Sequence, residues 1–332
     1  MYDVVKWVST MPSAGSYQSD GQPAEVSVKM WAPSWMASGQ QPVAILQLNH
    51  GMAEYIDRYD VFARAVASMG WLVVGMDFLG HGDSVTEASQ LGYTGVALPD
   101  GRNLLIEDMH GLRVLAQTQY PGIPYFMFAH SMGSFVLRAY LGEHGDGLSG
   151  AVISGTGSMA PSMVAVAKGL LGMMGLFHKP DYRSAFFASM SVGPYNKPFA
   201  KDGGARTPCD WLSRDTQQVD KYVDDPRCGF TFSLAADRLL IDAAARANAL
   251  ATYESTPKNL PLLMVSGGND PVGGMGKGVR EVRDTYIKVG MQDITLDLYT
   301  DARHELLNEL NRDTVTSDII AWLDDQAGRI QI

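Results

Sequence analysis

Short apolar runs alternate with longer amphipathic segments along most of the chain. Residues 24–31 alternate between polar and apolar side chains, which is typical of a half-buried strand. Residues 43–48 are almost continuously apolar, which predicts a strand buried on both faces. The whole pattern predicts strands at 24–31, 43–48, 72–76, 125–129, 151–154, 262–266 and 294–299, and helices at 59–69, 103–120, 134–141, 239–253, 279–289 and 314–325. This alternation favours an α/β fold with a mostly parallel sheet and helices on both of its faces.

The alternation stops at residue 157 and resumes near residue 239. The segment between these points is irregular, rich in methionine and glycine, and contains prolines. A chain of 332 residues is long enough for two domains or for one large core with an insertion. We interpret residues 1–156 and 239–332 as two parts of one α/β domain, and residues 157–238 as an insertion at an edge of its sheet.

Charge and hydropathy exclude several classes of protein. The chain has 26 Lys and Arg against 36 Asp and Glu, a net charge of −10, and it lacks the basic stripe of a nucleic-acid binder. No run of 18 apolar residues occurs, and the nearest, residues 163–177, is interrupted by Lys168 and three glycines. Cys209 and Cys228 are expected to be free thiols, and the N-terminus lacks the apolar core of a signal peptide. We therefore expect a cytoplasmic protein without stable membrane insertion.

The most specific motif lies in residues 126–135 (FMFAHSMGSF), where a predicted strand runs into a serine and then directly into a helix. This order is typical of a nucleophile elbow, a strained turn that raises a serine hydroxyl above the sheet. Small residues are needed two positions before and after the serine, and Ala129 and Gly133 occupy them. The sequence therefore predicts Ser131 as a nucleophile, although a serine that only caps a helix is the simpler alternative.

A serine nucleophile needs a base and an acid that orients the base. His304 follows the last predicted strand in a short loop, and Asp270 follows the strand before it. The order Ser, acid, His is that of a strand–helix hydrolase. Asp301 and Glu305 are rival acids, but they lie too close to His304 along the chain to orient its ring. The alternatives are a turn residue for Asp270 and an exposed loop residue for His304.

Backbone N–H groups are expected to complete the site as an oxyanion hole. The strand at 43–48 ends in Asn-His-Gly-Met, so we predict the N–H groups of Met52 and Met132 as donors and a structural role for His50. The loop at 77–84 is predicted to be structural as well. The glycines at 273–278 do not match a phosphate-binding loop, and no His, Cys and carboxylate cluster has metal-site spacing.

Five segments together resemble the α/β-hydrolase superfamily, and within it the group of monoacylglycerol lipases and lysophospholipases. They are residues 50–59, 77–84, 130–133, 268–272 and 303–305. The resemblance implies an eight-stranded sheet, a helical cap inserted after the sixth strand at residues 157–238, ester hydrolysis through an acyl-enzyme, and no cofactor or metal. It also supports the roles given above to Ser131, Asp270, His304 and the two amides. Ala129 and Ser134 depart from the family pattern Gly-x-Ser-x-Gly-Gly.

The predicted cap has to be interpreted from its own residues. Five of the 18 methionines fall within residues 159–190, and apolar side chains at 163, 164, 167, 170, 171 and 174 have helical spacing. This stripe either packs on the main domain, forms an adaptable wall for an acyl chain, or touches a membrane transiently. We name Met163, Leu170, Met174 and Phe230 as candidate substrate contacts.

The sequence as a whole predicts a serine carboxyl-ester hydrolase. Its expected substrate is a small-molecule acyl ester with a small polar alcohol, like a monoacylglycerol or a lysophospholipid. An acyltransferase, amidase or lactonase could use the same three residues, and a non-catalytic ligand-binding protein could use the same fold. The oligomeric state stays open.

Overall fold

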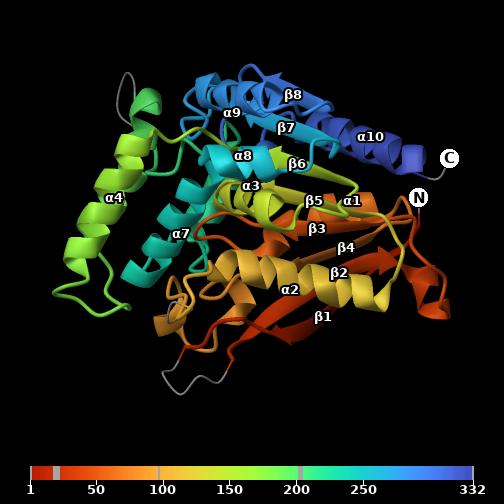
Figure 1. Ribbon diagram of the computed structural model, residues 1–332, viewed down its shortest axis with the longest axis horizontal. Coiled ribbons are helices and arrows are strands. Elements are labelled where there is room, and N and C mark those ends of the chain that lie inside the picture. Colours follow the sequence, from red (N-terminus) through yellow and green to blue (C-terminus); the bar gives the residue numbers. More distant parts are fainter. Residues whose placement is uncertain (1, 18–22, 96–97, 201–204, 331–332) are drawn as a thin grey trace.

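An eight-stranded sheet runs through the centre of the computed structural model, which describes residues 2–17, 23–95, 98–200 and 205–330 (Figure 1). The strand order is β1-β2-β4-β3-β5-β6-β7-β8. β2 is antiparallel to β1 and β4, and all other neighbours are parallel. The strands are β1 (Val4–Pro12), β2 (Glu25–Pro33), β3 (Ile45–Asn49), β4 (Leu72–Met76), β5 (Tyr125–His130), β6 (Gly150–Ser154), β7 (Leu262–Gly267) and β8 (Ile294–Tyr299).

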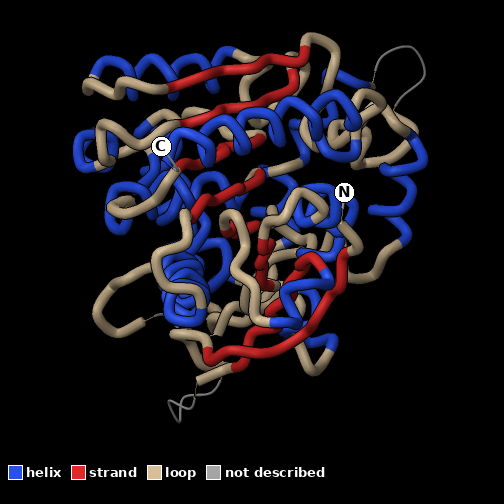
Figure 2. Tube along the Cα trace, turned by 90° about the vertical axis from the view of Figure 1, so that its right-hand side faces the viewer, coloured by secondary structure: helices blue, strands red, loops and turns tan. Residues whose placement is uncertain are grey.

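Helices cover both faces of the sheet (Figure 2). One core cluster joins the sheet to α2, α3, α7, α8 and α9, and a second joins the other face to α1 and α10. Every residue of β3, β4, β5, β6 and β7 is buried, which explains their continuous apolar runs. The helices are α1 (Asp60–Ala67), α2 (Leu104–Gln119), α3 (Met132–His144), α7 (Leu234–Ala247), α8 (Leu250–Ser255), α9 (Lys277–Lys288) and α10 (Arg312–Ile330).

The seven predicted strands are all present, and three details of the prediction are wrong or incomplete. β1 was not predicted, because its side chains are mostly exposed and follow no clear pattern. The predicted helix 239–253 is two helices, α7 and α8, separated at Asn248. The Asn248 side chain donates to the Ala244 carbonyl at 2.7 Å, a local bond that competes with helix continuation. α7 also begins earlier than predicted, because Ser233 caps it through Ala236 N–H.

The segment between β6 and α7 contains α4 (Pro161–Met174), α5 (Ala185–Ser191) and α6 (Thr216–Asp224). α4 stands beside α7 at one end of the sheet (Figure 1), where Leu171 packs with Phe187, Leu234 and Ile241. The predicted boundary at residue 238 falls inside α7, and the division into core and cap stays a prediction. Short 3-10 helices complete the described structure: η1 (Ser34–Ser38), η2 (Ile56–Tyr59), η3 (Gly82–Ser84), η4 (Ala88–Gln90), η5 (Gly193–Phe199) and η6 (Leu306–Asn308). None of the described helices has the length and apolar character needed to cross a bilayer.

Candidate active site

Ser131 lies in the turn between β5 and α3, and its backbone is strained. Its φ is +51°, a region that costs a non-glycine residue about 1–3 kcal/mol. The turn is tight because α3 starts against the end of β3: a β-carbon at Gly133 would lie 2.6 Å from the His50 carbonyl oxygen. Ser131 N–H donates to the Ser154 carbonyl at 3.0 Å, and Ser134 Oγ donates to the Ser131 carbonyl at 2.6 Å. Local sterics and these bonds therefore hold the serine in the geometry of a nucleophile elbow.

His304 and Asp270 meet at the carboxyl ends of β8 and β7. His304 Nδ1 lies 2.9 Å from Asp270 Oδ2, and both side chains are buried. The second oxygen of Asp270 accepts the N–H of Val272 at 2.8 Å. With Nδ1 donating to the carboxylate, Nε2 of His304 is the nitrogen able to accept a proton, and it has no hydrogen-bond partner among the described residues. The rival Asp301 is exposed and makes no bond to this ring.

Aromatic rings fix the plane of His304. Its ring centroid lies 4.9 Å from that of Trp211 and 4.6 Å from that of His130, the residue before Ser131. Gly155, with φ +61°, leaves the space: a β-carbon there would lie 2.9 Å from His130 Cε1 and 3.1 Å from His304 Cε1. No sequence pattern pairs Trp211 with His304, whereas the position of His130 directly before Ser131 is a signal that it lies near the site.

The two adjacent imidazoles have opposite pKa shifts. Burial opposes the charged form of His304, but the Asp270 carboxylate outweighs it and raises the pKa of His304 above its usual value. Burial, together with the nearby His304, lowers the pKa of His130 to about 4. Near neutral pH, His130 is therefore uncharged, and the proton taken up at this site belongs to His304.

The predicted oxyanion-hole residues lie on the two sides of the serine turn. Met132 is the first residue of α3, and Met52 lies in the loop after β3. The N–H groups of Met52 and Met132 donate to no carbonyl within the described part of the chain. The loop passes close to the serine, because a β-carbon at Gly51 would lie 3.1 Å from Ser131 Cβ. Two free N–H groups, one at a helix N-terminus, can thus receive a negative oxygen near Ser131.

His50 orders the start of this loop and has a structural environment. Its Nδ1 donates to the Gly51 carbonyl at 2.8 Å, and its Nε2 accepts the N–H of Phe78 at 3.0 Å. Burial lowers the pKa of His50, so the neutral ring uses both nitrogens. The Gly51 N–H in turn donates to Glu54 Oε1 at 2.6 Å. Gly51 thus has both its N–H and its carbonyl bonded, and the next N–H along the chain, that of Met52, is left free.

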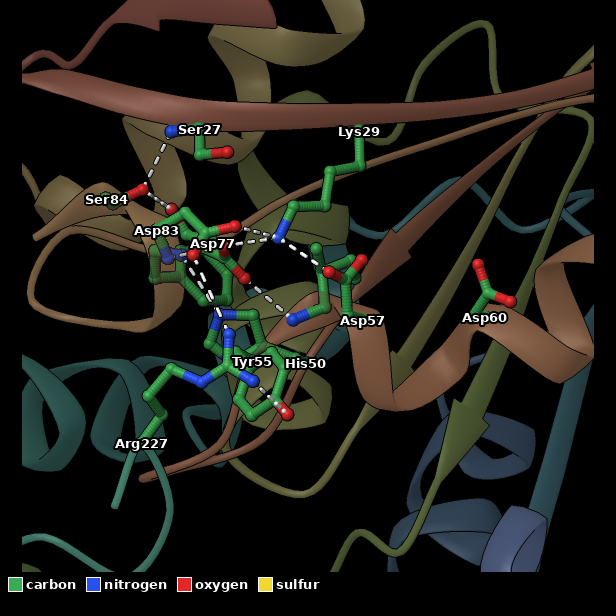
Figure 3. A network of polar contacts seen from close by, with 12 residues as sticks. Ser27, Lys29, His50, Tyr55, Asp57, Asp60, Asp77, Asp83, Ser84 and Arg227 are labelled. Atoms are coloured by element: carbon green, nitrogen blue, oxygen red, sulfur yellow. Dashed lines mark hydrogen bonds and ion pairs between the residues drawn. The ribbon is translucent and has the colours of Figure 1, made fainter. Parts of the chain in front are cut away.

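A buried lysine connects the loops around His50 (Figure 3). Lys29 Nζ lies 3.1 Å from Asp57, 3.1 Å from Asp77 and 2.7 Å from Asp83. Burial opposes its charge, but Asp77 and the other carboxylates raise the pKa of Lys29. Asp77 also accepts the Ile56 N–H at 2.7 Å. β2 therefore anchors both loops, in agreement with the structural role predicted for residues 77–84.

Arg58 bridges two loops: the loop after β3, which carries Met52, and the loop after β8, which carries His304 and is called the histidine loop below. Its Nη1 lies 2.5 Å from Glu54, and its two terminal nitrogens bond both oxygens of Glu305 at 2.7 and 2.6 Å. Burial raises the pKa of Glu305, but Arg58 outweighs this effect and lowers it to about 2. Glu305, considered above as a rival acid, is therefore the ion-pair partner of Arg58. The sequence shows Glu54 and Arg58 four residues apart but gives no sign of their distant partner.

Residues of the predicted cap also hold the histidine loop. Glu305 N–H donates to the Leu212 carbonyl at 2.7 Å, and Arg303 Nη1 donates to the Ser213 carbonyl at 3.1 Å. The Trp211 ring also lies beside the His304 ring. The segment 211–213 therefore contacts the loop of His304 through backbone carbonyls and through one aromatic side chain.

The four predicted substrate contacts have different surroundings. Met163 is 64% exposed on the outer side of α4, whereas Leu170 and Met174 are half-buried. Met174 packs against the cluster that joins α4 to α7. Phe230 is half-buried and its ring lies 5.3 Å from that of His81. Their contact with substrate stays a prediction.

A surface cavity of about 860 Å³ opens between η2, α6 and the start of α10. Tyr55, Lys221 and Arg312 are among the residues that line it, and Ser131 is not. Arg58 also lines the cavity, whereas Asp270 and His304 do not.

One group of possible metal ligands lies in the described part of the chain, and the expectation that the protein holds no metal stays a prediction. Glu107 of α2 and Glu143 and His144 of α3 bring their ligand atoms within 4.8 Å of one another. Spacing along the chain could not show this group because it comes from two helices. Arg102 and Arg246 pair with its two carboxylates, and each arginine also pairs with a second acid, Asp100 or Asp242.

Known proteins share this architecture over nearly its whole length. A family model described as serine aminopeptidase, S33 (Hydrolase_4) matches residues 40–311. A monoacylglycerol lipase from Mycolicibacterium smegmatis is 27% identical over 329 residues, covering 95% of this chain and 98% of its own. Human monoglyceride lipase is 25% identical over 306 residues, covering 88% and 86%. A highly thermostable carboxyl esterase from Bacillus coagulans, solved in complex with glycerol, has a TM-score of 0.84 at 27% identity, covering 97% and 99%.

These matches confirm the resemblance found in the sequence motifs. The family model extends over most of the chain, the Mycolicibacterium relative aligns over 95% of it, and the esterase structure covers 97% of it. The chain therefore belongs to the serine aminopeptidase S33 family of α/β-hydrolases, in its monoacylglycerol-lipase-like group of carboxylic ester hydrolases.

Proposed function

We propose that Ser131, His304 and Asp270 hydrolyse an acyl ester through an acyl-enzyme. The observation that carries this proposal is the buried His304–Asp270 bond of 2.9 Å, which leaves Nε2 of His304 free beside a strained serine turn. A buried imidazole with one nitrogen bonded to a carboxylate and the other unpaired is suited to accept a hydroxyl proton.

These positions support the following reaction. His304 Nε2 takes the proton of Ser131 Oγ, which attacks the ester carbonyl carbon and places negative charge on its oxygen. The N–H groups of Met52 and Met132 receive that oxygen, as preorganised donors that cost no reorganisation. His304 then protonates the leaving alcohol, and the ester bond breaks. A water molecule, deprotonated by His304, attacks the acyl-enzyme and releases the carboxylic acid.

The proposed substrate is a medium- or long-chain ester of a small polar alcohol, with a monoacylglycerol first and a lysophospholipid second. Relatives named monoacylglycerol lipase and monoglyceride lipase align over most of this chain, which favours the glycerol ester. Apolar side chains on α4 fit an acyl chain better than a peptide or sugar. The net charge of −10 disfavours an anionic headgroup.

Part of the predicted cap carries an apolar outer surface that supports contact with aggregated substrate. Its side chains are exposed by 64% at Met163, 61% at Val166, 79% at Leu176, 79% at Phe177 and 66% at Phe186. Large exposed apolar surfaces often mark interaction sites. We propose that it makes transient contact with lipid or micelle surfaces, without stable insertion.

Labelling with a fluorophosphonate probe tests the nucleophile. We expect wild-type protein and the Ser255→Ala control, which removes an exposed hydroxyl on α8, to be labelled. Ser131→Ala should lose both labelling and ester hydrolysis. Labelling of Ser131→Ala at wild-type level would overturn the assignment.

A series of p-nitrophenyl esters from acetate to palmitate tests the substrate class. We expect kcat/KM to rise with chain length beyond acetate, and monoacylglycerol to be hydrolysed faster than lysophosphatidylcholine. A maximum at acetate would contradict the proposed acyl chain. Product analysis with added alcohol distinguishes hydrolysis from acyl transfer.

A further inference from the structure

The loop that carries Met52 is bonded to Tyr222 in the last turn of α6 and to Gly229, which follows that helix. The Ala53 carbonyl accepts the hydroxyl of Tyr222 at 3.1 Å and the N–H of Gly229 at 2.9 Å. The Gly229 N–H also points at the Tyr222 hydroxyl oxygen, 3.2 Å away. Two donors from one distant segment therefore converge on a single carbonyl next to a predicted oxyanion-hole residue.

Ala53 needs such support because of its backbone conformation. Its φ is +52°, in the left-handed region that a residue with a β-carbon rarely adopts. Strained residues persist only where the surrounding structure holds them. Within the loop, His50 and Glu54 bond the Gly51 peptide groups, so the support of Ala53 comes from residues 222–229. We call residues 222–229 the cap latch.

A second set of contacts ties the cap latch to the same loop. The Tyr55 hydroxyl donates to Asp225 Oδ2 at 2.5 Å, and Arg227 Nη2 donates to the Tyr55 oxygen at 2.7 Å. The Arg227 guanidinium lies 3.9 Å from the centroid of the Tyr55 ring. Figure 3 shows Arg227 reaching from the cap side toward Tyr55 and Asp83. The loop is thus held on both sides of Glu54, at Ala53 and at Tyr55.

The Tyr222 hydroxyl is suited to donate its hydrogen bond to the Ala53 carbonyl at every pH at which an esterase works. Its ring is buried beneath the Arg58 guanidinium, whose carbon lies 4.9 Å from the ring centroid. Burial raises the pKa of Tyr222 well above its usual value, so the hydroxyl keeps its proton over the working pH range of an esterase.

We propose that Tyr222 is a positioning residue for the oxyanion hole: through the Ala53 carbonyl, the cap latch fixes the loop so that the Met52 N–H faces the developing oxyanion. The inference rests on the proposed function, since it assumes that the Met52 N–H stabilises the oxyanion. It assigns to this segment of the insertion a part in transition-state stabilisation, in addition to any contact of the cap with the acyl chain.

Tyr222→Phe tests the proposal because it removes the hydroxyl and keeps the ring. Loss of a whole oxyanion-hole donor lowers kcat by about 10²–10³. Because Met52 keeps its N–H and loses only its fixed direction, we expect kcat to fall about 5- to 50-fold, with KM changed less than 2-fold. The inhibition constant of a trifluoromethyl ketone, which forms the oxyanion, should rise by a similar factor. The affinity for an ether analogue, which forms none, should not change.

Control variants distinguish a positioning role of Tyr222 from a folding defect and from a failure of the proposed Ser131 mechanism. Tyr182→Phe removes the hydroxyl of a cap tyrosine whose ring stacks on His178, and it should keep wild-type kcat. If Tyr222→Phe is unstable, Arg227→Met is the alternative test. Arg227 is half-exposed, so this variant should fold. It weakens the hold on Tyr55, so we expect kcat to fall about 2- to 5-fold. Wild-type kcat and ketone affinity in both latch variants would overturn the inference. If wild-type protein is not labelled at Ser131 by the fluorophosphonate, the proposed function fails instead.

Discussion

His304, the proposed base, shows how much the orientation and the pKa of one side chain depend on its immediate surroundings. Asp270 bonds Nδ1, Trp211 and His130 flank the ring, and Nε2 alone is unpaired among the described residues. Burial by itself would lower the pKa of the ring; the carboxylate reverses that effect. Asp270 therefore both orients the His304 ring and raises its pKa.

The pH profile of Asp270→Asn tests this dependence. His304 must be neutral to accept the Ser131 proton, so activity falls as pH drops through the His304 pKa. Because that pKa is raised, the acidic limb of wild-type kcat/KM should lie above pH 6.5. Without the carboxylate we expect the limb to move to lower pH and kcat to fall about 10⁴-fold.

The exposed Asp301→Asn is the matched control and should keep the wild-type profile. An unshifted limb in Asp270→Asn, measured from pH 4.5 to 9, would contradict the assignment.

The sequence could predict which residues end each strand but not which distant partners hold them. Ser131, Asp270 and His304 each follow an apolar run, and parallel strands bring their carboxyl ends to one edge. Arg58 and Glu305 are 247 positions apart in the chain, and no local pattern joins them. Glu305 therefore looked like a competitor of Asp270 until its partner was known.

At the scale of elements, the burial of a strand determines whether its sequence pattern predicts it. Strands buried on both faces gave continuous apolar runs, whereas the exposed edge strand β1 gave none. The helix at 239–253 is divided into α7 and α8 at Asn248 and Ala249, where Ala249 is extended, and propensity does not reveal this break. α7 also buries Asp237, which is 7% exposed.

Asp237→Asn should stabilise α7 and with it the protein. Burial raises the pKa of Asp237 to about 7, against about 4 in the unfolded chain. Between these values folding requires proton uptake, so stability declines as pH rises, and the full cost is present above pH 7. Asparagine avoids this cost, and we expect a gain of about 1–3 kcal/mol at pH 8 and little at pH 4.

Asp242→Asn on the same helix is a control that should change stability in the opposite direction. Arg246 and Asn103 bond Asp242 and lower its pKa despite burial, so this change should destabilise at neutral pH. Urea unfolding at both pH values measures the two effects. A destabilised Asp237→Asn at pH 8 would show that the carboxylate has a favourable partner.

At the scale of the whole molecule, the apolar side chains exposed around α4 contrast with a net charge of −10. This distribution suits contact with neutral or zwitterionic lipid assemblies and disfavours anionic ones. The contact surface lies on the same inserted segment that also supplies the cap latch.

The double substitution Leu176→Ser and Phe177→Ser tests the surface. Transfer of two such side chains into an apolar phase is worth about 1.5–3 kcal/mol each. We expect activity on dispersed long-chain monoacylglycerol to fall at least 5-fold, while hydrolysis of soluble p-nitrophenyl acetate stays within 2-fold. Leu250→Ser, an exposed apolar residue of α8, should change neither. An equal loss on both substrates would exclude a role specific to aggregated lipid.

The insertion is attached to the catalytic loops at two places. Residues 211–213 bond the loop of His304, and residues 222–229 bond the loop of Met52. A hinge motion that lifted the whole insertion would therefore break the site each time a substrate entered. A motion confined to α4 and α5 would leave the bonds of residues 211–213 and 222–229 in place.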